Sequence, residues 1–532
     1  MTRRKAAIAS GLVLAAAVVL AALHWAGPGA AAQEPPASAG RAPCLDPDYT
    51  DLVIPPNIAP LNFRIQETGA RYETRILGVA GREIRVVSDA PDVVIPLDEW
   101  KDLLAANQGE HIEFRIRIQE DSGAWTDFAP VTNRVAQDPI DGYVAYRLMK
   151  PWYSLFREIQ IRQRNLERFE ETVLFDNQLS GESCMNCHSF LNRRGDRMLM
   201  HVRFPFCMVS VNGDKIDCVE TRTKLNKAPF AYTAWHPNGR IGVFSVNKIL
   251  QVYHTTGETR DAYDFKSDLV VYDFDKNMVT TVPPLATEER FETFPAWSPD
   301  GRFLYSCSAS ALEEKQLEGF RFIRYDLVRV AYDPDTDEWG TVETIVSSEA
   351  IDKSVTAPRI SPDGRFAAIC LSTRGSFPIF QPDSDIYLLD LASRELRPLT
   401  CNSEWADSWH SWSSNSRWLV FSSKRMDGVF TRLFICHIDE NGDSHKAFVL
   451  PQAAPGFYDG YLKLYNVPEL TIEPAHANAR ALERAVRTEK PTMKAQLDPQ
   501  LAALLEEEDA EAPGQDGKDA STREEWPTAE FH

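Results

Sequence analysis

Alternating polar and apolar positions dominate the chain from residue 46 to about residue 150. The runs 62–65, 83–87 and 113–118 place charged and apolar side chains on alternate positions. A period of two is typical of strands with one buried face and one face in water. Residues 46–150 are therefore expected to form a small β-sandwich-like domain.

A second pattern occurs four times further along the chain. Each copy has an apolar run, a tight turn and another apolar run, and the aligned positions Trp235, Trp297, Ile360 and Trp412 are 62, 63 and 52 residues apart. The turns need a residue that tolerates a positive φ, as Gly and Asn do. They read His-Pro-Asn-Gly-Arg at 236–240, Ser-Pro-Asp-Gly-Arg at 298–302 and 361–365, and Ser-Ser-Asn-Ser-Arg at 413–417.

Four-stranded units that recur at this spacing predict the blades of a β-propeller over residues 151–470. Four blades are clear, and a degenerate one spans 187–220. A sixth combines strands before Cys184 with strands after Tyr458, which would close the ring with both ends of the domain. The predicted fold is thus all-β with six blades, and five or seven blades are the alternatives.

The turns and the strand Asp-Ile-Tyr-Leu-Leu-Asp at 385–390 resemble TolB-like propellers, which are built from WD40-like (PD40) repeats. The segment Cys-Met-Asn-Cys-His-Ser-Phe at 184–190, Trp-His-Pro at 235–237 and Tyr-Asn-Val-Pro-Glu at 465–469 are similar to an exported subgroup of that family. The resemblance covers about 55–469. It implies a propeller joined to a haem-attachment motif, and it implies little about the reaction.

The segment 184–188 has the C-x-x-C-H pattern of covalent c-type haem attachment. Two thiols add to the haem vinyl groups, and the adjacent histidine supplies an axial nitrogen. A simple disulfide, a thioredoxin-like pair and half a zinc site are the competing interpretations, but neither a βαβ unit nor a second metal-binding pair accompanies the motif. We expect one haem c, anchored by Cys184 and Cys187, with His188 as proximal iron ligand.

The sequence does not assign the sixth iron ligand. His201 is the first candidate, followed by Met200 and Met198, because all three lie in a predicted strand close to the motif. His236 is the candidate from the propeller blades, since it replaces the serine found in the other turns. A site with an open distal position is the alternative.

The ends of the chain differ from the middle. Residues 1–32 combine three basic residues, an uncharged run over 6–23 and small residues at 30–32, which predicts a signal peptide or a signal anchor. Residues 33–45 form a linker. Residues 471–532 are expected to be helical and then disordered, with ten acidic and two basic residues from 501 onward. We therefore expect a periplasmic or exported protein, with membrane contact only if the N-terminal segment is uncleaved.

The net charge of −20 argues against nucleic acid as a partner. Against this background, the segment from Arg193 to Lys227 holds eight basic and four acidic residues. Its positive charge would either balance haem propionates or form a docking rim for an acidic redox partner in the cell envelope.

Nine cysteines are present, and two of them belong to the haem motif. Residues 206–219 are predicted to form a hairpin around Asn212-Gly213, a strong turn signal. That register places Cys207 opposite Cys218, within reach of a disulfide bond. The other five cysteines are expected to be mostly unpaired thiols.

The leading functional hypothesis is a periplasmic monohaem cytochrome that transfers single electrons to or from an envelope partner. One alternative is a haem enzyme that acts on peroxide or a nitrogen oxide at an open distal site, with His236 or His254 as acid or base. The other is a non-redox TolB-like scaffold that binds another protein. Whether the protein is an enzyme stays open.

Overall fold

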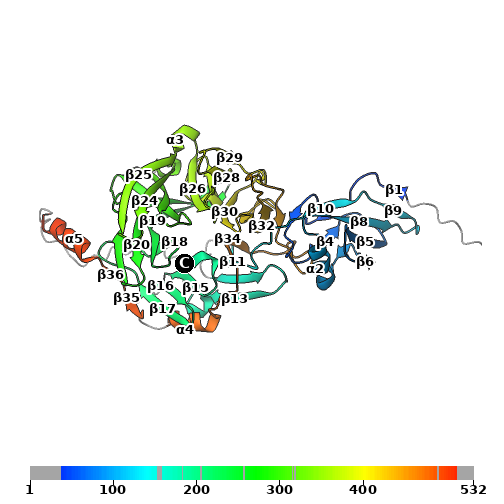
Figure 1. Ribbon diagram of the computed structural model, residues 1–532, viewed down its shortest axis with the longest axis horizontal. Coiled ribbons are helices and arrows are strands. Elements are labelled where there is room, and N and C mark those ends of the chain that lie inside the picture. Colours follow the sequence, from blue (N-terminus) through cyan, green and yellow to red (C-terminus); the bar gives the residue numbers. More distant parts are fainter. Residues whose placement is uncertain are drawn as a thin grey trace, which may run out of the picture.

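The computed structural model describes residues 37–151, 158–182, 184–203, 207–255, 258–313, 316, 319–487 and 491–511. The expected signal segment, His254's side chain and the acidic tail beyond residue 511 lie outside the described part. Within it, a ring of small sheets stands beside a separate N-terminal domain (Figure 1).

The N-terminal domain consists of two sheets and one helix, as its alternating pattern predicts. The apolar positions of the two sheets face each other, so Phe63 and Phe114 stack with ring centroids 5.9 Å apart and Trp100 of the helix packs at 6.2 Å. The seven-stranded sheet contains β1 (Ala37–Ser38), β3 (Val53–Ile54), β5 (Arg71–Gly78), β6 (Ile84–Ser88), β8 (His111–Gln119), β9 (Trp125–Asp127) and β10 (Val131–Val135). The smaller sheet contains β2 (Leu45–Asp46), β4 (Phe63–Ile65) and β7 (Asp92–Val93), and the helix is α2 (Leu97–Ala106).

Six further sheets form the β-propeller, and we number them as blades in chain order, with the ring-closing sheet last. Blade 1 has β14 (Met185–Phe190), β15 (Arg197–Val202), β16 (Cys207–Asn212) and β17 (Lys215–Glu220). Blade 2 has β18 (Phe230–Trp235), β19 (Ile241–Thr255), β20 (Glu258–Asp273) and β21 (Met278–Thr281), and blade 3 has β22 (Arg290–Trp297), β23 (Phe303–Ser310), β24 (Asp326–Asp333) and β25 (Glu338–Val346). Blade 4 has β26 (Ser354–Ile360), β27 (Phe366–Ser372), β28 (Asp385–Asp390) and β29 (Leu396–Pro398), and blade 5 has β30 (Asp407–Trp412), β31 (Trp418–Ser423), β32 (Arg432–His437) and β33 (Phe448–Val449).

Blade 6 joins the two ends of the propeller. Its strands are β34 (Leu464–Thr471), β11 (Tyr143–Met149), β12 (Ile159–Asn165) and β13 (Glu171–Asp176), with β11 paired to β34. The prediction that residues up to 150 belong to the N-terminal domain is therefore wrong for β11, because a strand's alternation does not tell which sheet it joins. The innermost strands β14, β18, β22, β26, β30 and β34 then neighbour one another around a closed ring.

The same β-bulge interrupts every innermost strand. In each blade, two residues of the inner strand stand opposite one residue of the next strand. In blade 1 the two residues are Cys187 and His188. In blades 2 to 6 the first bulge residue has a positive φ of 45–52°, and these residues are Tyr232, Phe294, Ala357, Trp409 and Val467. Bulges of this kind bend the strand and redirect side chains.

The repeated turns have the geometry that their residues predict. Gly239, Gly301 and Gly364 lie at φ values of 71–74°, in the left-handed region. In the fourth repeat Ser416 takes the same place at φ 61°, where its hydroxyl accepts the N–H of Asp363. A serine is thus accepted at a position that glycine holds in the other three turns.

The segment after β34 passes along the outside of blades 6, 1 and 2. Helix α4 (Ala479–Arg487) buries Leu482 and Val486 beside β13 and β17. Strands β35 (Met493–Lys494) and β36 (Gln496–Leu497) then extend blades 1 and 2, and α5 (Pro499–Glu511) follows. The purely helical start predicted for this segment is wrong, since open blade edges offer backbone partners to the chain. In the described residues, no helix combines the length and the apolar character needed to cross a membrane.

The remaining helices are single turns within loops of the propeller. They are η2 (Asn177–Ser180), η3 (Leu191–Arg193), η4 (Gly319–Phe322), α3 (Ser348–Ile351) and η5 (Pro378–Phe380).

Candidate functional site

The Cys184–His188 motif lies at the start of blade 1, where β14 begins. Cys184 precedes the strand and packs, half-buried, against an apolar cluster that includes Met185 and Phe190. Cys187 and His188 form the bulge of this inner strand. The side chain of Cys187 lies outside the described part of the structure.

The imidazole of His188 is buried between blades 1 and 6, with 3% of the residue exposed. Burial, together with the nearby charge of Arg147, lowers the pKa of His188 to about 3, and a hydrogen bond to the backbone of Ala145 opposes the shift. The ring is therefore neutral near neutral pH. Its Nε2 is buried and has no hydrogen-bond partner among the described residues.

Blade 5 carries a histidine at the equivalent position, which provides an internal reference. His410 follows Trp409 in the bulge of β30, and it is also 3% exposed with a pKa lowered to about 3 by burial. Its Nε2 lies 2.8 Å from the carbonyl oxygen of Ala368, and its Nδ1 lies 3.6 Å from the Sγ atom of Cys370. Both ring nitrogens of His410 thus have partners, whereas His188 keeps one nitrogen unused.

The chemistry of this donor set fits a covalently attached haem. A histidine that ligates iron is neutral, and a hydrogen bond from its other nitrogen to a backbone carbonyl orients the ring. Leaving a buried nitrogen without a hydrogen-bond partner costs about 1–3 kcal/mol of stability. A bound group that accepts the lone pair or proton of the His188 Nε2 would remove this cost. Cys184 and Cys187 would hold the haem, and His188 would ligate iron through Nε2. No group of three His, Cys, Asp or Glu side chains suited to a bare metal ion occurs within the described residues.

The structure separates the candidates for the distal ligand. His201 lies on the face of β15 that packs on blade 2, where its Nε2 is 3.1 Å from the Thr233 hydroxyl and its ring contacts Phe230 and Phe244. His188 is on the other side, where it contacts Phe190 at 6.3 Å and bonds to Ala145. The first candidate is therefore not brought to the face that holds the proximal histidine. Met198 and Met200 lie in the cluster that contains Phe190 and Ala145.

His236 has a structural role in the turn of blade 2. Its Nδ1 accepts the N–H of Asn238 at 3.2 Å, and its Nε2 lies 3.1 Å from the carbonyl oxygen of Gly301. In the other repeats a serine hydroxyl caps this turn, as Ser298 does for Phe303. The structure thus places His236 at the far end of the inner strand from the bulge, and both of its nitrogens are in use.

Two charged residues beside the motif have roles that the sequence analysis did not predict, although it noted the segments that contain them. Glu469, in β34 of blade 6, accepts the backbone N–H of Phe190 at 2.9 Å. Desolvation raises the pKa of Glu469 to about 7. Half-buried Arg193 follows the motif, and its Nε donates to the carbonyl of Trp412 at 2.9 Å. These residues join blade 1 to blades 6 and 5.

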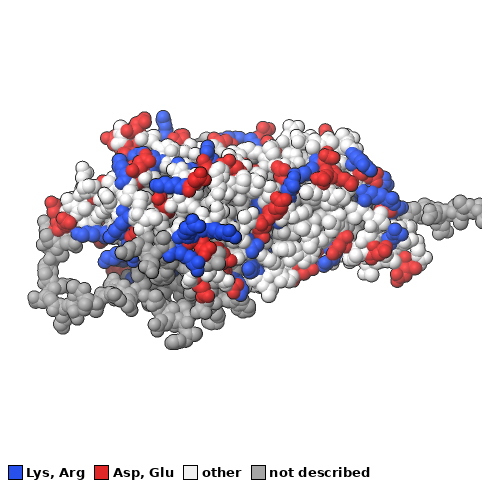
Figure 2. Space-filling model, turned by 90° about the horizontal axis from the view of Figure 1, so that it is seen from below, with Lys and Arg blue, Asp and Glu red and all other residues white. Residues whose placement is uncertain are grey.

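The basic residues from Arg193 to Lys227 do not form one continuous patch. Arg193 bonds to the carbonyl of Trp412 in blade 5, and Arg197 bonds to the carbonyl of Gly239 in blade 2. Four others pair with acids, and the pairs are Arg194 with Asp196, Lys215 with Asp217, Arg222 with Glu220, and Lys224 with Glu506. Seen from below, many blue side chains of the described face lie next to red ones, with large white areas between these groups (Figure 2).

The predicted disulfide between Cys207 and Cys218 is not formed, and its register is wrong. The turn falls at Gly213-Asp214, so Asn212 pairs with Lys215 and Cys218 stands opposite Val209. The shift of two positions makes the two buried cysteines diagonal neighbours. Their side chains hydrogen-bond to each other, which raises the pKa of the Cys207 thiol, and both remain free thiols.

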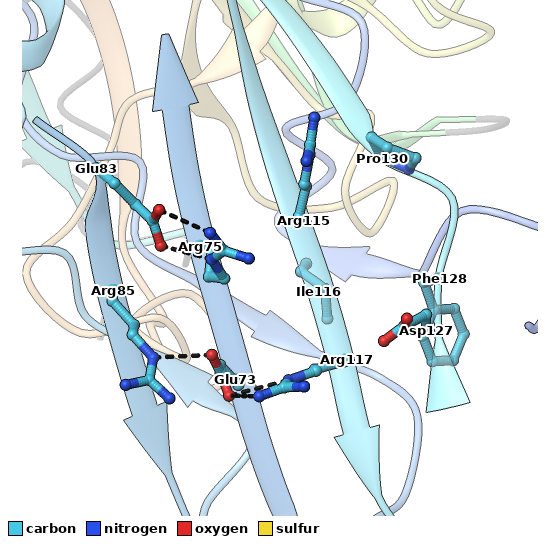
Figure 3. Close-up of a pocket in the computed structure, with 10 residues that line it drawn as sticks. All are labelled: Glu73, Arg75, Glu83, Arg85, Arg115, Ile116, Arg117, Asp127, Phe128 and Pro130. Carbon is cyan, nitrogen blue, oxygen red and sulfur yellow. Dashed lines mark hydrogen bonds and ion pairs between the residues drawn. The ribbon is translucent and has the colours of Figure 1, made fainter. Parts of the chain in front are cut away.

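A pocket of about 650 Å³ lies far from the motif, on the outer face of the N-terminal domain (Figure 3). Its floor holds ion pairs, because Glu73 lies between Arg85 and Arg117 and Glu83 pairs with Arg75. The lining contains no cysteine or histidine. Its charges are thus largely matched internally.

Comparisons with known proteins leave the function open. No protein-family model and no curated protein matches the chain. An oligogalacturonate lyase from Vibrio parahaemolyticus is 11% identical, with 71% of this chain and 100% of that chain covered at a TM-score of 0.32. A putative 6-phosphogluconolactonase from Bacteroides uniformis is 11% identical, with 66% and 94% covered at 0.32. A prolyl endopeptidase is 12% identical at 0.30, and this chain spans 36% of its length and is itself covered over 51%. Similarities at this level carry no argument about activity.

Proposed function

We propose that this protein is an exported monohaem c-type cytochrome that exchanges single electrons with a partner in the cell envelope. We also propose that it belongs to the exported TolB-like subgroup that its motifs resemble. The observation that carries the proposal is the buried Nε2 of His188, which lies within a C-x-x-C-H motif and has no hydrogen-bond partner among the described residues. The equivalent histidine of blade 5, His410, has partners for both ring nitrogens.

Each residue of the site has a distinct role in this proposal. Cys184 and Cys187 form the two thioether bonds, and His188 binds iron through Nε2 while its other nitrogen bonds to the backbone of Ala145. When bound, the haem supplies a one-electron ferric–ferrous couple. Glu469 holds β14 to blade 6 through the Phe190 N–H and so fixes the strand that carries His188.

The surroundings of His188 also determine the protonation state and the tautomer of its ring. The neutral ring needs no deprotonation before it binds iron at neutral pH, because burial already lowers its pKa to about 3. The hydrogen bond at the other nitrogen selects the tautomer whose Nε2 carries the lone pair. His410 has the same burial but no free nitrogen, so it is the matched non-ligand.

The decisive experiment expresses the full chain together with a c-type haem maturation system. We expect one covalent haem per chain, detected by mass and by the pyridine haemochrome spectrum. The variant His188→Ala should lose the axial histidine, as seen in the low-spin resonance Raman bands. His410→Ala should keep them. A chain that matures without covalent haem would overturn the proposal.

A partner in the envelope follows from the proposed role rather than from a visible patch. Arg203 and Lys227 are exposed basic residues of the expected docking segment. Reduction by an acidic donor protein should slow in the double variant Arg203→Glu, Lys227→Glu and should slow in wild type as salt increases. Equal rates for wild type and variant at low salt would remove this segment from the proposal.

A further inference from the structure

The six equivalent bulge positions differ sharply in their side chains. Blades 2, 3 and 5 place the large aromatic residues Tyr232, Phe294 and Trp409 there, whereas blades 4 and 6 have Ala357 and Val467. A positive φ is unfavourable for bulky residues, and an aromatic side chain at this position is strained. Only the bulge geometry is common to all blades, so the choice of side chain needs its own explanation.

The three aromatic rings meet at the axis of the propeller. Tyr232 and Phe294 have centroids 4.2 Å apart, Phe294 and Trp409 are 5.7 Å apart, and Tyr232 and Trp409 are stacked at 6.0 Å. Blades 2 and 5 stand on opposite sides of the ring, so their residues can touch only across its centre. Phe377, from the loop between β27 and β28, adds a fourth ring 6.2 Å from Tyr232.

Blade 1 has Cys187 at this same register position. Tyr232, two residues before Ala234, and Cys187, two before Ser189, occupy corresponding places in their bulges. The position across the ring from blade 1 belongs to Ala357 in blade 4, whose small side chain takes little of the axial space. The register therefore brings the second haem-attaching residue to the ring of positions from which the aromatic cluster is built.

We propose that the axial aromatic cluster, made of Tyr232, Phe294, Trp409 and Phe377, is the surface that packs against the haem attached at Cys187. This inference rests on the proposed function. A flat apolar macrocycle gains most from contact with aromatic faces, and such contact excludes water from one side of the iron. The cluster would then limit access of small ligands and help to set the redox potential.

The test uses the haem-loaded full chain and removes one ring of the cluster. Trp409→Leu is the main variant, and Phe294→Leu replaces it if the first does not fold. Trp297→Leu is the matched control, because Trp297 is also a buried inner-strand tryptophan, 8% exposed, but lies at the far end of β22 beside His236. The readouts are covalent haem content, the midpoint potential and the dissociation constant of imidazole for ferric protein.

We expect Trp409→Leu to keep full haem content, to lower the midpoint potential and to bind imidazole more tightly by on the order of tenfold. Trp297→Leu should match wild type in all three. If both variants match wild type, or if both change equally, the haem lies elsewhere and the inference fails while the proposed function stands. If wild type carries no covalent haem, the proposed function itself fails.

Discussion

Blades 1 and 5 have the same bulge in the inner strand and a histidine at the same place in it, yet only one histidine is fully bonded. His410 bonds to Ala368 and Cys370, and His188 bonds to Ala145, the residue that corresponds to Ala368. The repeated fold thus supplies a buried pocket for an imidazole in either blade. The partners of the second nitrogen decide whether that imidazole is fully bonded, as in His410, or keeps one nitrogen available, as our proposal requires of His188.

The two junctions of blade 6, with blade 5 on one side and with blade 1 on the other, also differ in one hydrogen-bond acceptor. Between blades 5 and 6 the hydroxyl of Ser411 accepts the N–H of Leu470 at 3.3 Å. Between blades 6 and 1 the carboxyl of Glu469 accepts the equivalent N–H of Phe190. Of these two junctions, the one beside the C-x-x-C-H motif has a titratable group where the other has a hydroxyl.

The largest expected effect comes from the thiols of the two blades. Cys184→Ala combined with Cys187→Ala should abolish covalent haem, because both thioether bonds are lost. The control is Cys401→Ala combined with Cys436→Ala, which should keep the haem. These two thiols are also buried, and their Sγ atoms are in contact at 3.3 Å. Mass spectrometry of the intact chains measures both. Haem retained in the first double variant would break the comparison.

The histidines should also differ in their contribution to stability without haem. His410→Ala removes two bonds and leaves the Ala368 carbonyl buried, so we expect the free energy of unfolding to fall by about 2–4 kcal/mol. His188→Ala in the haem-free chain should cost less, about 1–2 kcal/mol, because one of its nitrogens has no partner to lose. Denaturant unfolding followed by tryptophan emission gives both values. A larger loss for His188→Ala would contradict the assignment.

Both histidines should make the haem-free protein less stable in mild acid. Their folded pKa of about 3 lies below the ordinary 6.5, so the unfolded chain binds protons that the folded chain does not. Each contribution is complete above pH 6.5 and decreases as the pH falls, by about 2 kcal/mol between pH 6.5 and 5. His410→Gln should flatten the pH dependence of unfolding by one proton relative to wild type. The same substitution at the exposed His111 of the N-terminal domain is the comparison variant.

The smallest expected effect is at the junction between blades 6 and 1. The folded pKa of Glu469, about 7, lies above the ordinary 4.5, so its contribution to stability is present below pH 4.5 and is lost as the pH rises through 7. Glu469→Gln keeps an acceptor for Phe190 but does not ionise. We expect it to be more stable than wild type by about 1 kcal/mol at pH 8 and equal to it near pH 4.5. Ser411→Ala should show no such dependence on pH.

Local signals predicted much of the fold. The Pro-Asp-Gly-type turns located the inner strands of blades 2 to 5, and the alternation at 113–118 located β8. The hairpin after Cys207 shows the limit, because both Asn212-Gly213 and Gly213-Asp214 can form a two-residue turn, and packing of the strands selects the second. The role of Glu469 was invisible, since its partner Phe190 is 279 residues away.

The amino-acid sequence by itself determined the repeated blades and the pattern from Cys184 to His188, because turn geometry and thioether chemistry depend on residues close together in the chain. The tertiary structure decided which imidazole nitrogen is free, that His201 faces blade 2, and that Cys187 shares a register position with Tyr232, Phe294 and Trp409. The physical reason is that burial and hydrogen-bond partners come from neighbouring blades. In a closed ring those neighbours include strands from opposite ends of the chain.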